Sequence, residues 1–138
     1  MDIFVFAGIL ALAYFLGGIP FGWLVARAFG VTDIRAHGSG NIGATNVWRT
    51  LGPKAAAWVY AGDIGKGVLA VLLARSVHQN LIPPDYFLVL AALAAVTGHV
   101  FSVYLAFRGG KGVSTALGVM ISLLPWHTLI ALAAFILT

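Results

Sequence analysis

The sequence predicts an all-α, polytopic integral membrane bundle that forms one transmembrane domain over residues 1–138. Three observations lead to this prediction. Hydrophobic residues make up 61% of the 138 residues and charged residues only 9%. Four segments approach the roughly 20 mostly apolar residues that a membrane-spanning helix needs. Lysine and arginine gather in alternate loops, which is typical of a chain that crosses a membrane several times.

The four expected transmembrane helices cover about residues 3–26, 55–74, 86–107 and 113–138. The first has neither the basic start nor the cleavage site of a signal peptide, so we expect a retained helix. Within it, residues 17–22 (Gly-Gly-Ile-Pro-Phe-Gly) leave backbone groups without helical partners, which predicts a kink facing protein or a cavity. The last segment ends without a charged or aromatic flank, so we expect the chain to be incomplete at its C-terminus.

The basic residues separate the loops into two groups. Loop one (residues 27–54) and loop three (residues 108–112) contain most of them, whereas Arg75 alone borders loop two (residues 75–85). The positive-inside rule therefore places loops one and three in the cytoplasm and the N-terminus and loop two outside. The basic residues of loops one and three are Arg27, Arg35, Arg49, Lys54, Arg108 and Lys111.

Composition also excludes several classes of function. The net charge of +4 is spread over loops, so we expect no nucleic acid partner. The chain has no cysteine, which excludes a thiol nucleophile and a Cys-ligated metal, and its scattered Asp and His residues predict neither a metal nor a cofactor. His37 occupies the first glycine position of a G-x-S-x-G elbow around Ser39, and no carboxylate is placed in the sequence to orient a histidine. Any reaction must therefore use an already activated substrate.

Loop one contains a cluster of residue types suited to a phosphate group. Glycines let backbone N–H groups approach an oxyanion, hydroxyls and amides donate hydrogen bonds, and arginine supplies a bidentate fork. Residues 38–43 also match G-x-G-x-x-G, but no strand precedes them, so the match is coincidental. A flexible turn is the alternative, and it does not explain two amides, two hydroxyls and an arginine. The candidate residues are Gly38, Ser39, Gly40, Asn41, Gly43, Thr45, Asn46 and Arg49.

Loop three resembles a second anion site at the start of the fourth expected helix. A helix N-terminus attracts anions through its free N–H groups and its dipole. The spacing of the glycines around Lys111 does not fit a Walker A loop, so nucleotide hydrolysis is disfavoured. A basic turn that only fixes topology is the alternative. The candidates here are Gly109, Gly110, Lys111, Gly112 and Thr115.

Three polar residues within the expected spans are further candidates. Asp63 and Lys66 lie in the second span, where each charge is unfavourable by about 2.5–3.5 kcal/mol on an insertion scale. Their i, i+3 spacing lets them pair, so structural pairing and substrate contact both remain open. His99 lies near the cytoplasmic end of the third span, where it either reaches the same site or forms a structural hydrogen bond.

Together these motifs resemble the bacterial acyl-phosphate:glycerol-3-phosphate acyltransferase family over essentially the whole chain. The resemblance rests on residues 38–46 with Arg49, on Asp63 with residues 66–67, and on residues 98–113, in this order. It implies a fold of about seven transmembrane helices, of which four are present here, and a further C-terminal motif outside these 138 residues.

The resemblance also implies the reaction, the partners and the location. Glycerol 3-phosphate would receive a fatty acyl group on its 1-hydroxyl from acyl phosphate, which gives lysophosphatidate and phosphate in phospholipid synthesis. The protein would lie in the lipid bilayer of the bacterial inner membrane, with its active site facing the cytoplasm. Ser39, Arg49, His99 and Lys111 would act in catalysis, and the other candidates would bind substrate. Because the sequence offers no oriented base, a phosphate oxygen of the donor would take the hydroxyl proton.

Two other classes of function fit parts of the pattern. A small phosphate or anion transporter, or a channel subunit, would also use a kinked helix, buried charges and glycine-rich loops on one side. It does not explain the order of the three motifs. A purely structural scaffold leaves the amide-rich loop one unexplained. The sequence carries no signal for an oligomeric state.

Overall fold

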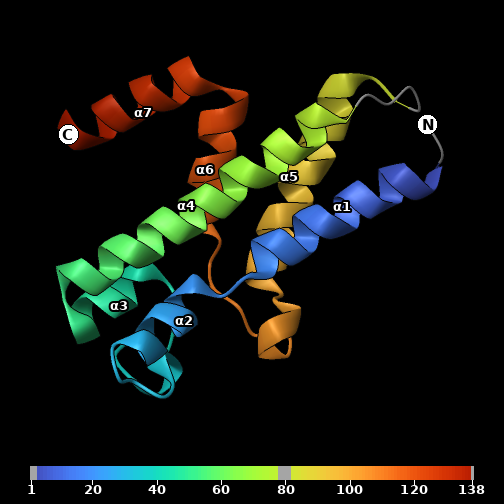
Figure 1. Ribbon diagram of the computed structural model, residues 1–138. Helices are drawn as coiled ribbons and strands as arrows, with labels where there is room; N and C mark the ends of the chain where they lie inside the picture. The colour runs from blue at the N-terminus through green and yellow to red at the C-terminus, as the bar shows by residue number, and fades with distance from the viewer. Residues whose placement is uncertain (1–2, 78–81, 138) are drawn as a thin grey trace.

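The computed structural model describes residues 3–77 and 82–137, and every regular element in this part of the chain is a helix (Figure 1). The all-α prediction is therefore confirmed. Part of expected loop two falls on residues 78–81, outside the described residues. In chain order the elements are α1 (Ile3–Gly18), α2 (Phe21–Ala28), η1 (Ile34–Ala36), α3 (Ala44–Leu51), α4 (Pro53–Ser76), α5 (Pro84–Val100), η2 (Val103–Leu105), α6 (Val113–Leu123) and α7 (Pro125–Leu137).

Three helical segments are long and apolar enough to cross a membrane: Ile3–Ala28, Pro53–Ser76 and Pro84–Leu105. The fourth expected span is not one helix, because α6 ends at Leu123 and α7 begins at Pro125. Proline lacks an N–H and its ring clashes with the carbonyl four residues earlier, so it starts a helix more readily than it continues one. With 11 and 13 residues, the two helices are about 16 and 20 Å long, short of the roughly 30 Å hydrocarbon core.

The predicted kink in the first span is confirmed as a break between α1 and α2 at Ile19 and Pro20. Two carbonyls at the break find partners on other elements. Ser102, which follows α5, donates to the carbonyl of Gly18 at 2.6 Å, and Lys66 of α4 donates to the carbonyl of Ile19 at 2.7 Å. A broken helix at membrane depth is tolerated only when such groups are satisfied within the protein. The break is therefore fixed by two neighbouring segments.

Small residues allow the helices to cross closely. At the α1–α5 crossing, a Cβ on Gly17 would collide with the carbonyl of Ala95, and one on Gly98 would collide with the carbonyl of Tyr14. Close backbone approach at small residues is the usual way in which helices pack inside a bilayer, where apolar burial drives association little. The same device at the α4–α6 crossing uses Gly67 and Gly118, which lie against the carbonyls of Thr115 and Ile64.

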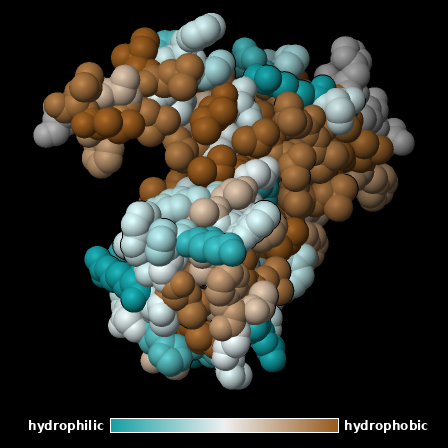
Figure 2. Space-filling model, turned by 60° about the vertical axis from the view of Figure 1, so that its left-hand side comes forward, coloured by the Kyte–Doolittle hydropathy of each residue, from teal (hydrophilic) through white to brown (hydrophobic). Residues whose placement is uncertain are grey.

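The helices α2 and α3, the two 3₁₀ turns η1 and η2, and loops one and three gather at one end of the molecule, which we call the loop end (Figure 1). It comprises α2, residues 29–43, α3 and residues 101–112. Figure 2 shows hydrophilic and intermediate residues at this end and mostly hydrophobic residues over the rest of the visible surface. The two glycine-rich motifs, separate in the chain, are thus brought to the same end.

Candidate functional site

Loop one is held in shape by the side chain of Asn46. Its Oδ1 accepts a hydrogen bond from the backbone N–H of Ser39 at 2.8 Å. Its Nδ2 donates to the carbonyls of Asn41 at 2.8 Å and His37 at 3.0 Å, with a longer contact to Ile34 at 3.3 Å. Asn46 is 2% exposed and its amide is hydrogen-bonded inside the loop. Its side chain therefore fixes the conformation of loop one.

Loop three is held against the end of α5 by two of its glycines. The N–H groups of Gly109 and Gly110 donate to the carbonyls of Val100 and His99, each at 3.1 Å. These carbonyls lack intrahelical partners because α5 ends there. The N–H groups of Gly109 and Gly110 are thus engaged with α5, and a Cβ on either residue would collide with His99.

Between the two loops lies a pocket of about 380 Å³. The N-terminal turns of α3 and α6 both border it, so two helices direct unpaired N–H groups and the positive ends of their dipoles toward one cavity. Gly112, with a φ of 76°, gives the chain the left-handed turn that begins α6. The lining residues are Ser39, Asn41, Gly43, Ala44, Thr45, Asn46, Arg49, Tyr60, Asp63, His99, Lys111, Gly112, Val113 and Ser114.

Arg49 and Lys111 supply positive charge from opposite loops. Both side chains are exposed, and in residues 3–77 and 82–137 neither forms an ion pair. A cation without a protein partner at a pocket wall is available to an anionic ligand. The pocket therefore combines two free cations with the hydroxyls of Ser39, Thr45 and Ser114.

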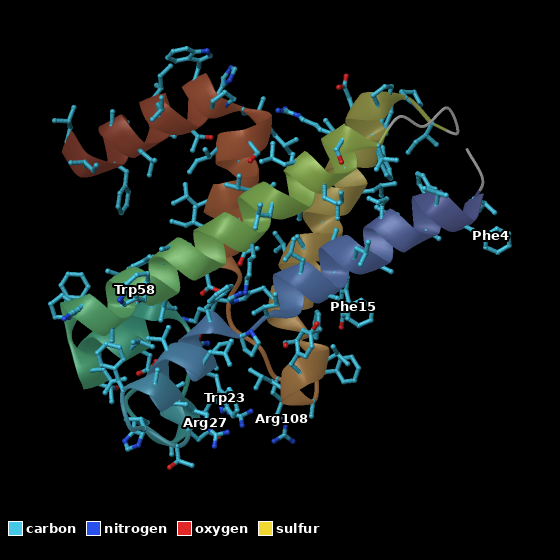
Figure 3. All side chains as sticks on the ribbon, viewed as in Figure 1. Phe4, Phe15, Trp23, Arg27, Trp58 and Arg108 are labelled. Carbon is cyan, nitrogen blue, oxygen red and sulfur yellow. The ribbon has the colours of Figure 1, made fainter. Side chains whose placement is uncertain are left out.

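Other arginines of the loop end have different roles. Arg35 pairs with Asp33 at 2.7 Å, and hydrogen bonds from Arg35 hold the pKa of the Asp33 carboxyl below its ordinary value. Arg27 stacks on the ring of Trp23 at 4.5 Å, and Figure 3 places this pair and Arg108 at the same end of the molecule. None of these three arginines lines the pocket. A basic residue at the loop end is therefore not necessarily part of the pocket.

The floor of the pocket is formed by buried polar side chains from α4 and α5. Asp63 and His99 both line the pocket and are 2% and 3% exposed. Oδ1 of Asp63 is 2.8 Å from Nζ of Lys66 and 3.6 Å from Nδ1 of His99. The hydroxyl of Thr115 on α6 lies 3.1 Å from the same Nδ1. No sequence spacing places Asp63 beside His99, and the structure brings them to within 3.6 Å through the packing of α4 and α5.

The structure thus gathers most of the predicted site residues around one cavity. All four residues expected in catalysis line it: Ser39, Arg49, His99 and Lys111. Of the residues expected to bind substrate, Asn41, Gly43, Thr45, Asn46, Asp63 and Gly112 line it, whereas Gly38, Gly40, Lys66, Gly109, Gly110 and Thr115 do not. Lys66 lies behind Asp63 with its ammonium on the carbonyl of Ile19, and Thr115 lies behind His99.

Sequence reasoning missed Tyr60 and Ser114. Tyr60 precedes Asp63 by three residues, which puts both on one face of a helix, and this spacing was a usable signal. Ser114 and Thr115 are adjacent in the first turn of α6, and only the rotation of that helix decides which of them faces the pocket. No group of three or more potential metal ligands lies together in the part of the chain that the structure describes.

The fold and the site define a polytopic helical membrane protein with one cationic pocket between two glycine-rich loops. Residues 7–138 match the profile of the glycerol-3-phosphate acyltransferase family. The chain belongs to this family.

Curated relatives and solved structures agree with this assignment. A glycerol-3-phosphate acyltransferase of Geotalea daltonii is 53% identical over 126 residues, which cover 91% of this chain and 62% of the relative. One of Clostridioides difficile is 46% identical, with 99% of this chain and 68% of the relative covered. The chain thus spans about three fifths to two thirds of the length of these relatives.

Two crystal structures of PlsY, an integral membrane glycerol 3-phosphate acyltransferase, share the fold. The glycerol 3-phosphate form superposes with a TM-score of 0.82 at 39% identity and covers 94% of this chain and 62% of PlsY. The lysophosphatidic acid form gives a TM-score of 0.80 at 37% identity. The membrane-bundle prediction is confirmed by this likeness.

Proposed function

We propose that the protein containing this chain transfers a fatty acyl group from acyl phosphate to the 1-hydroxyl of glycerol 3-phosphate. The products are lysophosphatidate and inorganic phosphate, and the reaction belongs to phospholipid synthesis. The observation that carries the proposal is the pocket at which two helix N-termini and the cations of Arg49 and Lys111 converge. Both substrates carry phosphate, and a mixed anhydride already has a good leaving group. Positioning and charge stabilisation then supply much of the catalysis.

The roles of the pocket residues follow from their chemistry. The hydroxyls of Ser39 and Thr45, with the free N–H groups at the start of α3, bind one phosphate. Arg49 and Lys111 stabilise the negative charge that grows on the departing phosphate and on the attacked carbonyl oxygen. Asn46 keeps loop one in the shape that presents these groups, because its amide is hydrogen-bonded within the loop.

We propose that the pocket faces the cytoplasm of a bacterial inner membrane. The loop end contains most of the basic residues, and the positive-inside rule assigns such loops to the cytoplasmic side. A water-soluble acceptor such as glycerol 3-phosphate then enters from the aqueous phase. The acyl chain of the donor remains in the apolar part of the bilayer.

The proposal is tested by measuring phosphate release from an acyl phosphate with and without glycerol 3-phosphate. The complete reading frame that contains these 138 residues is purified in detergent, and the 138-residue chain is assayed beside it. Acyl-CoA serves as the control donor, and transfer from it is followed by the release of free CoA thiol. Phosphate release from acyl phosphate that depends on glycerol 3-phosphate, without transfer from acyl-CoA, supports the proposal. Phosphate flux into vesicles without donor consumption would instead favour an anion transporter.

A further inference from the structure

The two glycine-rich loops that border the pocket meet at one apolar side chain. Loop one continues into α3, whereas loop three is hydrogen-bonded to the end of α5. A Cβ on Gly110 of loop three would lie 3.1 Å from Cγ1 of Ile42 in loop one. Gly110 directly precedes Lys111, and the residues on both sides of Ile42 line the pocket. The contact between the loops is therefore next to the site.

Hydrogen bonding and packing fix the position of Ile42. Oδ1 of Asn41 accepts a hydrogen bond from the backbone N–H of Gly43 at 2.9 Å, which closes a tight turn around Ile42. A Cβ on Gly22 of α2 would collide with the carbonyl of Ile42, so these two backbones are in close contact. Ile42 is 2% exposed. Because a β-branched side chain has few χ1 rotamers, it is stiff as well as buried.

Gly110 is also fixed, and it has no side chain with which to adapt. It is buried, and its N–H donates to the carbonyl of His99 at 3.1 Å. A Cβ at this position would collide with the ring of His99. Since the backbone of Gly110 is held against α5 and Ile42 is held against α2, the side chain of Ile42 limits how closely the two loops approach.

Ile42 also joins loop one to the segment that leads into loop three. It belongs to a buried hydrophobic cluster that includes Val47 of α3 and Leu105 of η2. The carbonyl of Leu105 accepts a hydrogen bond from the N–H of Arg108 at 3.1 Å, which ties η2 to loop three. Side chains in such a cluster are close-packed, so a change in the volume of one affects its neighbours. The same residue therefore connects the two loops through two contacts.

The spacing of the loops matters because each carries one cation of the pocket. Arg49 and Lys111 line the cavity from loop one and loop three. Two like charges repel each other, whereas a bound phosphate attracts both. The distance between the loops thus decides whether both cations reach the ligand. Charged groups stabilise developing charge best when their positions are set before the ligand binds.

We propose that Ile42 is a positioning residue that sets the spacing of loop one and loop three, so that Arg49 and Lys111 act on the substrate phosphates together. The inference rests on the proposed transfer reaction, in which the pocket binds those phosphates. Ile42 touches no substrate in this account. It acts through its contact with Gly110.

The spacing is measured without reference to activity, by pulsed electron–electron double resonance between two nitroxide labels on the complete reading frame. These 138 residues contain no cysteine, and any cysteine elsewhere is replaced by serine. The labels are attached at Trp48→Cys on α3 and Arg108→Cys on loop three, because both positions are exposed and outside the pocket. We expect one narrow distance distribution with Ile42 present and a broader one in Ile42→Ala. An unchanged distribution in Ile42→Ala would overturn the inference.

Two further variants separate spacing from stability. Ile42→Val keeps both carbons attached to Cβ, including the one nearest Gly110, so it should keep the narrow distribution. Ile34→Ala removes the same atoms from a buried isoleucine of the same cluster, but this residue lies in η1. It should lower Tm about as much as Ile42→Ala and leave the distance unchanged. Equal broadening in Ile34→Ala and Ile42→Ala would mean that only core packing is disturbed, and it would overturn the inference.

A measurement on the wild type covers the case in which Ile42→Ala does not fold. The complete reading frame is labelled with ¹³C-isoleucine and ¹³C-glycine, and the Ile42 signals are identified by their loss in Ile42→Val. We expect a nuclear Overhauser effect between side-chain protons of Ile42 and the Hα protons of Gly110. Its absence from a folded wild type would contradict the contact on which the proposal depends.

The consequence for transfer is measured on the same variants without labels. Misplacing a reacting group by about 1 Å can lower a rate about 100-fold, so kcat/KM for glycerol 3-phosphate should fall about tenfold or more in Ile42→Ala. Ile42→Val and Ile34→Ala should stay within about threefold of the wild type. Wild-type kcat/KM in Ile42→Ala would overturn the positioning role and leave the transfer reaction standing. If the wild type transfers no acyl group, the proposed function fails, and the distance measurement still decides whether Ile42 sets the spacing.

Discussion

Replacing Lys66 with methionine gives the sharpest test of how the break between α1 and α2 is stabilised. The side chain of Lys66 is 1% exposed, and its ammonium contacts both Oδ1 of Asp63 and the carbonyl of Ile19. Lys66→Met keeps most of the apolar stem but leaves a buried carboxylate without its cation and a buried carbonyl without its donor. Removing one partner of a buried ion pair destabilises a protein by about 3–5 kcal/mol. At roughly 3 °C per kcal/mol for a chain of this size, Tm should fall by about 9–15 °C.

The assay is thermal unfolding of the purified protein in detergent, with Lys54→Met as the control. Lys54 lies on the same helix but is exposed and outside the pocket, so its loss should change stability by less than about 0.5 kcal/mol. The double variant Asp63→Asn, Lys66→Met should recover at least 1 kcal/mol relative to Lys66→Met, since neighbouring charges couple. If the unfolding free energy of Lys66→Met lies within about 1 kcal/mol of that of the wild type, the account of Lys66 is refuted.

Further predictions concern the pocket and the helix crossings. Arg49→Ala and Lys111→Ala should each lower kcat/KM at least 100-fold without changing Tm, because both cations are exposed and unpaired in the described chain. The control variant Arg27→Ala should keep a kcat/KM near that of the wild type. Normal transfer in either pocket variant would contradict the assignment. Gly118→Ala should destabilise by about 1–3 kcal/mol in thermal unfolding, because its Cβ would collide with the carbonyl of Ile64. A Cβ on Gly8 would have open space around it, so Gly8→Ala should be neutral or stabilising by up to about 1 kcal/mol. Equal changes of stability in Gly118→Ala and Gly8→Ala would contradict the packing argument.

The spans and their break were predictable because local chemistry decides them. Long apolar segments form helices in a bilayer, and Pro20 within a glycine-rich stretch interrupts one. Pro125 carried the same signal, whereas the apolar composition of residues 113–138 predicted one continuous span. Where composition and backbone chemistry disagreed, the backbone chemistry decided where the helix ended.

Much of the lining of the candidate pocket was predictable from the sequence, but the contacts among its residues were not. The residue types of loops one and three indicated a phosphate site, and the pocket gathers most of them. Whether an amide faces the ligand or the loop depends on tertiary hydrogen bonds, so the sequence did not show that Asn46, which also lines the pocket, uses its amide within loop one. The approach of Asp63 to His99 depends on how two helices cross, 36 residues apart in the chain, and no local spacing encodes it.

The central claim is that the cavity between the N-termini of α3 and α6 binds substrate phosphate. Determining the structure of the complete reading frame with glycerol 3-phosphate tests it most directly. The account predicts a phosphate within hydrogen-bonding distance of Arg49 or Lys111 and of a backbone N–H in the first turn of α3 or α6, with the glycerol hydroxyls toward His99. A phosphate bound outside this cavity, with Arg49 and Lys111 both out of reach, would contradict it.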